Sequence, residues 1–275
     1  TFKPCAVIPS RNHYRDIGQV VAALRDLDLP VYVVDDGSDE PARTAIQDLH
    51  APDNLVTVLR LDANQGKGGA VCHGLRAAAA GDFTHVLQID ADGQHDLSAL
   101  PRLLSLAREH PDALVSGRPV YDESIGTGRK IARWITHAWV WIETLSFRIT
   151  DTMCGFRVYP LAPTIKVINE ERVGSRMDFD IGIMVHLYWR GVDVIPLPVR
   201  VIYPPENISN FHTLKDNWRI TCLHTRLVLP LLLRLPRIFR NRPARAGPSR
   251  HWSALAERGA DWGLRLSAMA HRLFG

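Results

Sequence analysis

Long hydrophobic runs are scarce in this chain of 275 residues. The longest apolar run near the C-terminus, Leu227–Leu233, is far shorter than the roughly 20 residues that a membrane-spanning helix requires. No charged stretch followed by an apolar one opens the sequence, so nothing there resembles a secretory signal. Because the chain starts at Thr1 rather than Met, we expect it to be trimmed. We therefore predict a cytoplasmic protein in which no segment crosses a bilayer.

Cysteines are few, and none stands at a motif spacing. The chain has four of them, with no CxxC pair and no histidine at zinc-finger spacing: Cys5, Cys72, Cys154 and Cys222. This pattern excludes a disulfide framework and a zinc finger. We predict reduced and mostly buried thiols.

Acidic residues are missing from the stretch 226–250, which carries seven arginines, while the whole chain has a net charge of +4. The stretch lacks the interleaved aromatic residues of a base-stacking surface and has no DNA-binding motif, so we predict no nucleic acid partner. Arginines spaced among leucines favour contact with an anionic membrane surface. A solvated basic linker is the alternative.

The first half of the chain alternates short β-branched runs with helical patterns. This alternation predicts an α/β fold in which a mostly parallel central sheet is flanked by helices, with binding sites at the carboxyl ends of the strands. The runs that read as strands are 5–9, 31–36, 55–61, 85–90 and 113–117.

Beyond Arg118 the pattern changes to a long mixed helix with three tryptophans. Trp134, Trp139 and Trp141 favour either core packing or an interfacial belt over sugar stacking. A last strand follows over 192–204. We predict a catalytic domain over 1–220, a basic amphipathic or linker segment over 221–250, and a C-terminal helix over 251–275.

A group of polar side chains is expected where the strands end. The stretch "QIDADGQH" places Asp90 and Asp92 directly after an apolar run, and two carboxylates at this spacing can bind one cation. The alternative is an Asx-type turn with Gly93. With Asp36 and with Lys67, which opens a glycine-rich helix start, these carboxylates suit a metal-bound diphosphate. Asp35 and Asp36 also suit hydrogen bonds from a base or ribose.

The motifs "VVDDGS", "NQGKGGA", "DADGQH" and "DTMCGFRVYP" follow one another in this order. In this register they resemble the family 2 glycosyltransferases with the GT-A fold, especially the branch of polyprenyl-phosphate (dolichyl-phosphate) sugar transferases. The resemblance covers roughly residues 1–220. It implies inverting transfer of a sugar from a nucleotide-diphosphate donor of UDP or GDP type to a membrane lipid or a lipid-linked acceptor such as polyprenyl phosphate.

The resemblance also implies roles for single positions. Asp90 and Asp92 match the Asp-x-Asp that holds Mg²⁺ or Mn²⁺ on the diphosphate. The positions implied for the donor are Pro9, Ser10, Arg11, Asp36, Lys67 and Gln94. Those implied for phosphate or acceptor are Arg118, Arg129 and, in the stretch after the last strand, His212 with Asn210 and Lys215.

The chain departs from the family pattern at the general base. Relatives commonly read Phe-Asp-x-Glu, whereas here "FDIG" puts Gly182 in place of the glutamate. Asp178 or Asp180 remains as the catalytic candidate. Since residues i and i+2 of a helix cannot both face the site, we favour Asp180. A helix-capping carboxylate is the alternative for either residue.

The tail over 251–275 resembles the opening helices of an acyltransferase domain fused to some bacterial glycosyltransferases. This resemblance implies a piece of a longer bifunctional protein. The leading hypothesis is a metal-dependent glycosyltransferase, peripheral on the inner face of the membrane. The alternative is a non-catalytic module that binds nucleotide sugars or lipids.

Overall fold

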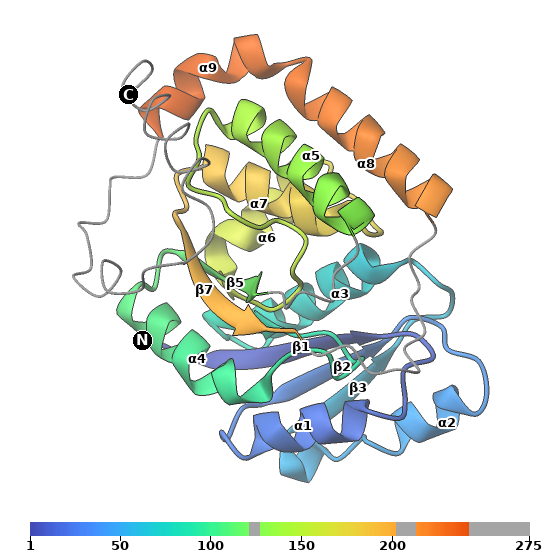
Figure 1. Cartoon of the computed structure of the whole chain (residues 1–275). Helices are drawn as coiled ribbons and strands as arrows, with labels where there is room; N and C mark the ends of the chain where they lie inside the picture. Colours follow the sequence, from blue (N-terminus) through green and yellow to red (C-terminus); the bar gives the residue numbers. More distant parts are fainter. Residues whose placement is uncertain (121–126, 202–212, 242–275) are drawn as a thin grey trace. The chain divides into compact units, whose positions relative to one another are not determined.

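The computed structural model describes residues 1–120, 127–201 and 213–241. A seven-stranded sheet lies at its centre in the order β3-β2-β1-β4-β6-β5-β7, and helices cover both faces (Figure 1). The strands are β1 Pro4–Ser10, β2 Val31–Asp35, β3 Val56–Arg60, β4 His85–Gln88, β5 Leu114–Val120, β6 Arg157–Pro160 and β7 Val194–Arg200. The five strands predicted for the first half of the chain are thus confirmed as β1 to β5.

Nine α-helices are present in the described ranges. They are α1 Ile17–Arg25, α2 Ala42–Gln47, α3 Lys67–Ala80, α4 Leu100–Glu109, α5 Thr127–Thr144, α6 Leu161–Glu170, α7 Phe179–Trp189, α8 Thr213–Val228 and α9 Leu231–Arg240, with two single 3₁₀ turns, Pro52–Asn54 and Leu97–Ala99. The helices α8 and α9 contain residues 221–228 and 231–240, the larger part of the basic segment.

The strand β6 runs antiparallel to both of its neighbours, β4 and β5, whereas every other pair in the sheet is parallel. The first residue of β6, Arg157, therefore pairs with the last residue of β4, Gln88. Because of this reversal, the loop that leads into β6 lies at the same sheet edge as the carboxyl ends of the parallel strands. The "DTMCGF" motif over 151–156 reaches the predicted site by this route.

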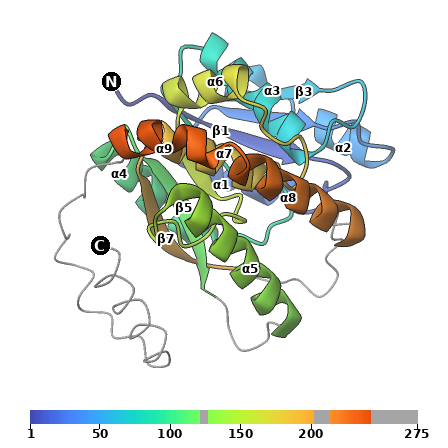
Figure 2. The ribbon, with the colours of Figure 1, turned by 90° about the horizontal axis from the view of Figure 1, so that it is seen from above.

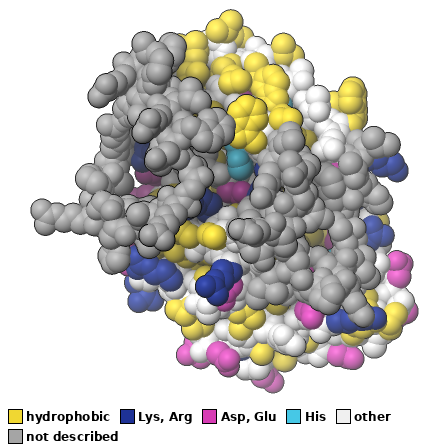
Figure 3. All heavy atoms as spheres, in the orientation of Figure 1, with side chains coloured by type: hydrophobic (Ala, Val, Ile, Leu, Met, Phe, Trp, Pro, Cys, Tyr) yellow, Lys and Arg dark blue, Asp and Glu magenta, His cyan; other side chains and the backbone are white. Residues whose placement is uncertain are grey.

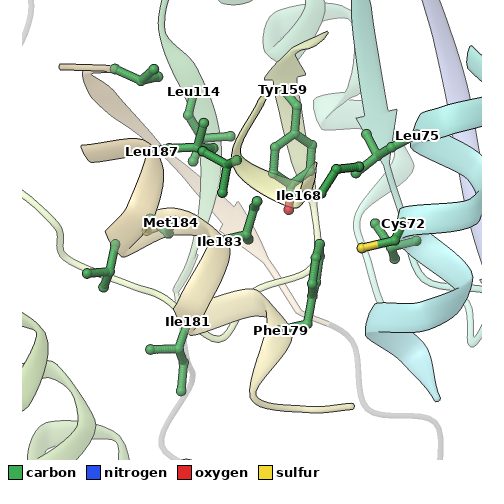
Figure 4. Packing of buried hydrophobic residues seen from close by; sticks show 14 of the residues in the cluster. Cys72, Leu75, Leu114, Tyr159, Ile168, Phe179, Ile181, Ile183, Met184 and Leu187 are labelled. Atoms are coloured by element: carbon green, nitrogen blue, oxygen red, sulfur yellow. The ribbon is translucent and has the colours of Figure 1, made fainter. Parts of the chain in front are cut away.

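Two hydrophobic cores fill the two faces of the sheet. In β1, Cys5 and Val7 belong to the core under α3, α6 and α7, and Ala6 and Ile8 belong to the core under α1, α2 and α4. This alternation is the period of two expected for a strand buried on both faces. Figure 4 shows the ring of Tyr159 in the first core, among side chains from α3, α6 and α7.

The helices α5, α8 and α9 add buried side chains to the core under α3, α6 and α7, among them Val140, Leu223 and Ile238. The helix α5 packs on α7 on one side and on α8 on the other, and both ribbon views show α5 and α8 side by side (Figures 1 and 2). None of the helices in the described ranges is long and apolar enough to cross a bilayer. Cys5, Cys72 and Cys154 are buried free thiols, whereas Cys222 of α8 is exposed.

Candidate functional site

A cavity of about 380 Å³ opens at the carboxyl edge of the sheet. It has the volume of a small-ligand site. Walls come from the ends of β1, β2 and β4, from the start of α3, and from α5, α7 and α8. Of the residues predicted for the site, nine line this cavity: Pro9, Ser10, Arg11, Asp36, Lys67, Asp90, Asp92, Gln94 and Asp180.

Asp36 fixes the turn that starts α3. Its two carboxylate oxygens accept hydrogen bonds from the backbone N–H groups of Gln65 at 2.6 Å and Gly66 at 2.8 Å. Gly66 has a φ of +88°, which a side chain would oppose. Burial raises the pKa of the Asp36 carboxyl, and the two backbone donors and nearby arginines only partly oppose that shift. The turn thereby presents the N-terminus of α3 to the cavity.

Asp35 has a different environment from its neighbour. Its carboxylate accepts a hydrogen bond from the backbone N–H of Ser38 at 2.9 Å and forms an ion pair with Arg60 on β3. Arg60 stands opposite Asp35 in the register of β2 and β3. Asp35 is absent from the cavity lining. Its contacts with Ser38 and Arg60 instead hold the end of β2.

Lys67 joins two carboxylates from distant parts of the chain. Its Nζ lies 2.9 Å from Asp90 at the end of β4 and 3.0 Å from Oδ2 of Asp180 in α7. Burial would lower the pKa of the Lys67 amine, but Asp180 and Asp90 outweigh it and the pKa is raised. Burial would raise the pKa of Asp90, yet Lys67 and His95 bring it well below its usual range. Lys67 and Asp90 are therefore charged at neutral pH.

Gly155 of the "DTMCGF" motif closes over this cluster. A Cβ atom at Gly155 would stand 2.6 Å from Nζ of Lys67 and 2.8 Å from Oδ2 of Asp90. A real Cβ atom essentially never comes this close to another heavy atom, so a side chain here would displace the ends of Lys67 and Asp90. Asp151 shapes the same loop by accepting hydrogen bonds from the backbone N–H groups of Met153 and Cys154, both at 2.9 Å.

Asp90 and Asp92 both face the cavity, as the Asp-x-Asp spacing predicts. Asp92 also accepts a hydrogen bond from the backbone N–H of Gln94 at 3.1 Å, so the stretch is an Asx-type turn as well. In the described ranges, no three His, Cys, Asp or Glu side chains converge on a possible metal position. Two carboxylates on one cavity wall nevertheless fit a hard cation that takes its remaining ligands from a bound diphosphate and water.

Asp180 and Asp178 differ in where their carboxylates lie. Asp180 lines the cavity, while the Asp178 carboxylate accepts a hydrogen bond from the backbone N–H of Arg176 at 3.1 Å at the start of α7. Gly182 faces neither group: a Cβ atom there would meet Leu223 of α8 at 3.4 Å. That distance is an ordinary contact, so the space beside α8 admits a small side chain at 182.

Arg157 holds Asp180 from the side of the sheet. This fully buried side chain donates to three backbone carbonyls, those of Cys154, Thr152 and Asp180, each at 2.7 Å. The neighbouring Gln88 donates from its Nε2 to Oδ1 of Asp180 at 3.4 Å. Arg157 thus ties the "DTMCGF" loop to the first turn of α7. Arg157 was not among the residues predicted from the sequence.

Three further arginines, which were not predicted from the sequence, line the cavity. They are Arg133 of α5, Arg176 before α7 and Arg219 of α8. Arg133 pairs with Asp151, Arg219 pairs with Asp216 at 2.8 Å, and Arg176 donates to Oδ1 of Asn64 at 3.0 Å. Only Arg176, next to the "MDFD" stretch, had a signal in the sequence.

Of the other predicted positions, two are described and absent from the cavity lining, and the side chains of the rest fall outside the described part of the chain. Arg118 lies on β5 and is absent from the lining. Arg129 lies in the first turn of α5, and its side chain is outside the described part. Asn210 and His212 also lie outside the described residues, while Lys215 is exposed on α8.

Comparison with known proteins agrees with this geometry. The family model "Glycosyl transferase family 2" matches residues 5–171. An undecaprenyl-phosphate mannosyltransferase of Micrococcus luteus is 27% identical over 202 residues, which are 71% of this chain and 82% of the relative.

Two solved structures share the fold at lower identity. One is S. aureus TarS in complex with UDP-GlcNAc, with a TM-score of 0.58 at 15% identity, covering 88% of this chain and 74% of that one. The other is the glucosyl-3-phosphoglycerate synthase of Mycobacterium tuberculosis with Mn²⁺ and UDP-glucose, with a TM-score of 0.57 at 16% identity, covering 89% and 82%. The match of the family model over more than half of the chain shows that this protein belongs to glycosyl transferase family 2, with the GT-A fold.

Proposed function

We propose that the protein transfers a sugar, with inversion, from a UDP- or GDP-linked donor to a membrane lipid or a lipid-linked acceptor such as polyprenyl phosphate. One observation carries the proposal: Asp90, Asp92, Lys67 and four arginines line a single cavity at the sheet edge. Carboxylates on one wall suit a cation, and the cationic side chains suit phosphate groups.

The donor side is built by β1, β2 and the start of α3. Ser10 and Arg11 follow β1, and Asp36 follows β2, in position to contact the nucleoside. Nε of Arg11 is buried and has no hydrogen-bond partner among the described residues, which leaves it available for an anionic ligand. The backbone N–H groups at the start of α3 add a favourable environment for negative charge.

The cation, Mg²⁺ or Mn²⁺, would be held by Asp90 and Asp92. When bound, it neutralises the diphosphate and stabilises the nucleoside diphosphate as a leaving group. The solved synthase of similar fold carries Mn²⁺ beside its UDP-glucose, which supports this choice of cation. Lys67 keeps Asp90 ionised and in place for that role.

The reaction needs an acceptor oxygen that forms a bond to the anomeric carbon as the bond to the diphosphate breaks. A lipid phosphate is already anionic and needs no general base, and the cavity offers arginines to bind it. A hydroxyl acceptor would need a base, and Asp180 faces the cavity for that task. The name of the 27% identical relative, an undecaprenyl-phosphate mannosyltransferase, favours the phosphate acceptor.

The proposed reaction places the protein in the cytoplasm, peripherally on the inner face of the membrane, because the donor is water-soluble and the acceptor is a lipid. The arginine-rich stretch 226–250 supports contact with an anionic surface there.

A transfer assay tests this proposal. The full chain is incubated with a radiolabelled UDP- or GDP-sugar and Mn²⁺, with either a polyprenyl phosphate or the matching polyprenol as acceptor. We expect a lipid-linked product with the phosphate, loss of that product in Asp92→Ala, and little product with the alcohol. Hydrolysis of the donor without any lipid product, from either acceptor, would contradict the proposal.

A further inference from the structure

Exposed apolar side chains are concentrated on one part of the surface. Among the described residues, ten of the twelve exposed large hydrophobic side chains belong to α5, α8, α9 or the turns directly after α5 and α8. Figure 3 shows hydrophobic side chains gathered along the upper edge of the molecule, where Figure 1 draws these helices. We call the ten residues the helical face: Trp134, Ile135, Trp139, Ile142, Phe147, Trp218, Leu229, Leu232, Leu233 and Phe239.

The exposure of the helical face is large for apolar side chains. Trp218 is 69% exposed, Leu232 78% and Leu233 87%. Monomeric soluble proteins rarely expose a group of this size unless it contacts a partner or a lipid surface. The core alternative for the tryptophans of α5 is therefore wrong for Trp134 and Trp139, which are 63% and 41% exposed.

The charges on the same helices all have one sign at the surface. The three helices contain only two acidic residues, Glu143 and Asp216, and these are 0% and 3% exposed. Glu143 is bound to His224 at 2.7 Å, and Asp216 pairs with Arg219. The exposed charges on these helices are thus cationic, as at Lys215 and Arg240, which complements an anionic surface.

The helical face borders the cavity. On α5, Arg133 lines the cavity while the next residue, Trp134, is exposed. On α8, Arg219 lines the cavity while the preceding residue, Trp218, is exposed. Two neighbouring helices therefore each place an arginine in the cavity and an adjacent tryptophan at the surface.

From these observations we propose that the helical face inserts into the head-group region of an anionic lipid bilayer, with Trp134 and Trp218 at the rim of the cavity. Tryptophan is suited to this depth because its ring is apolar and its N–H is polar. The inference rests on the proposed function in one respect: a lipid acceptor would then reach the cavity without leaving the membrane. It goes beyond the arginine-rich stretch, because α5 and Trp218 lie outside that stretch.

Vesicle sedimentation with the full chain tests the inference, without donor or acceptor. The vesicles contain phosphatidylcholine alone or mixed with the anionic phosphatidylglycerol. We expect binding to the mixed vesicles that weakens as salt is added. Two double variants are compared with the wild type. The rim variant combines Trp134→Ser with Trp218→Ser, and the α9 variant combines Leu232→Ser with Leu233→Ser. Each should lower the partition coefficient about tenfold or more. The matched control is Leu55→Asn, which removes an exposed apolar side chain at 47% exposure on another part of the chain.

A second pair of substitutions tests the competing occupant, residues 251–275 of the chain itself. Trp252→Ser with Trp262→Ser leaves binding unchanged if the helical face contacts lipid. Loss of binding in this variant alone would overturn the inference. Failure of the wild type to bind any vesicle would also overturn it, and is the result expected if the helical face binds an acidic protein instead. Nucleotide binding is measured in the absence of lipid for every variant. If the wild type binds nucleotide but no vesicle, the inference fails while the proposed function stands.

Discussion

Nζ of Lys67 lies 3.0 Å from Oδ2 of Asp180, so the first residue of α3 forms an ion pair with the first turn of α7. This contact fixes the one carboxylate of the "MDFD" stretch that faces the cavity. It also connects that carboxylate, through Lys67, to the Asp-x-Asp stretch.

We expect Asp180→Asn to lower turnover about 100-fold or more, by analogy with other charged groups at reaction centres, because the substitution removes a carboxylate that holds Lys67 in the cavity. The affinity for the donor nucleotide should change much less. Single-turnover kinetics and nucleotide titration separate the two effects. Asp178→Asn is the matched control, since Asp178 is absent from the cavity lining. Equal losses of turnover in both variants would show that the position of Asp180 has no special role.

Gly155→Ala should weaken donor binding while the protein remains folded, because the added Cβ would stand 2.6 Å from Nζ of Lys67 and would displace the ends of the Lys67 and Asp90 side chains. Gly182→Ala is the control, since its Cβ would have ordinary contacts with Leu223 at 3.4 Å. That variant should be as active as the wild type and stabilised by roughly 0.5–1 kcal/mol, the usual gain from alanine in a helix. Thermal unfolding and nucleotide titration of both variants decide the matter, and a fully active Gly155→Ala would count against the described geometry.

Arg157→Lys should lower the free energy of unfolding by about 3 kcal/mol or more, because lysine cannot replace three donors in a fixed fork and leaves buried carbonyls unpaired. Urea denaturation measures this loss. Arg102→Lys is the control, on the exposed side of α4 with a side chain 59% exposed, and it should unfold like the wild type. A similar result for both variants would mean that the buried fork at Arg157 contributes little.

Acid should destabilise the protein through His186. Burial lowers the pKa of this imidazole from 6.5 to about 4, with Glu171 opposing the shift and Arg234 adding to it. Between pH 4 and pH 6.5 the imidazole binds fewer protons in the folded state than in the unfolded state. The contribution of His186 to the free energy of unfolding is therefore fully present above pH 6.5 and is lost as the pH drops toward 4.

Replacing His186 by glutamine should therefore flatten the pH dependence of unfolding in that window by up to about 1.4 kcal/mol per pH unit. Unfolding by urea at a series of pH values measures the slope. His110→Gln, at an exposed position after α4, should keep the slope of the wild type. An unchanged slope in His186→Gln would locate the acid sensitivity elsewhere.

The periodic parts of the fold could be predicted from the sequence. The strands β1 to β5 consist of β-branched, apolar runs, and the polar residues at their ends mark the edge where Asp36, Lys67 and Asp90 meet. The strand β6 could not be found in this way, because it has four residues and ends in Pro160. Its antiparallel direction depends on pairing with β4 and β5, which no local pattern encodes.

The far wall of the cavity was also beyond sequence reasoning. Arg133 and Arg219 belong to amphipathic helices, and nothing in their local pattern separates an arginine in the cavity from one in solvent. Packing of α5 against α7 and α8 decides which of them face inward.

The most direct test of the central claim is isothermal titration of the full chain with UDP, GDP and their sugar conjugates, with and without Mn²⁺. We expect metal-dependent binding of one nucleotide class. Asp92→Ala should weaken this binding about tenfold or more, because the variant loses a cation ligand. Asp62→Ala, which removes an exposed carboxylate after β3, should bind like the wild type. Binding that ignores both Mn²⁺ and Asp92→Ala, or no binding of any nucleotide, would contradict a metal-bound diphosphate at Asp90 and Asp92.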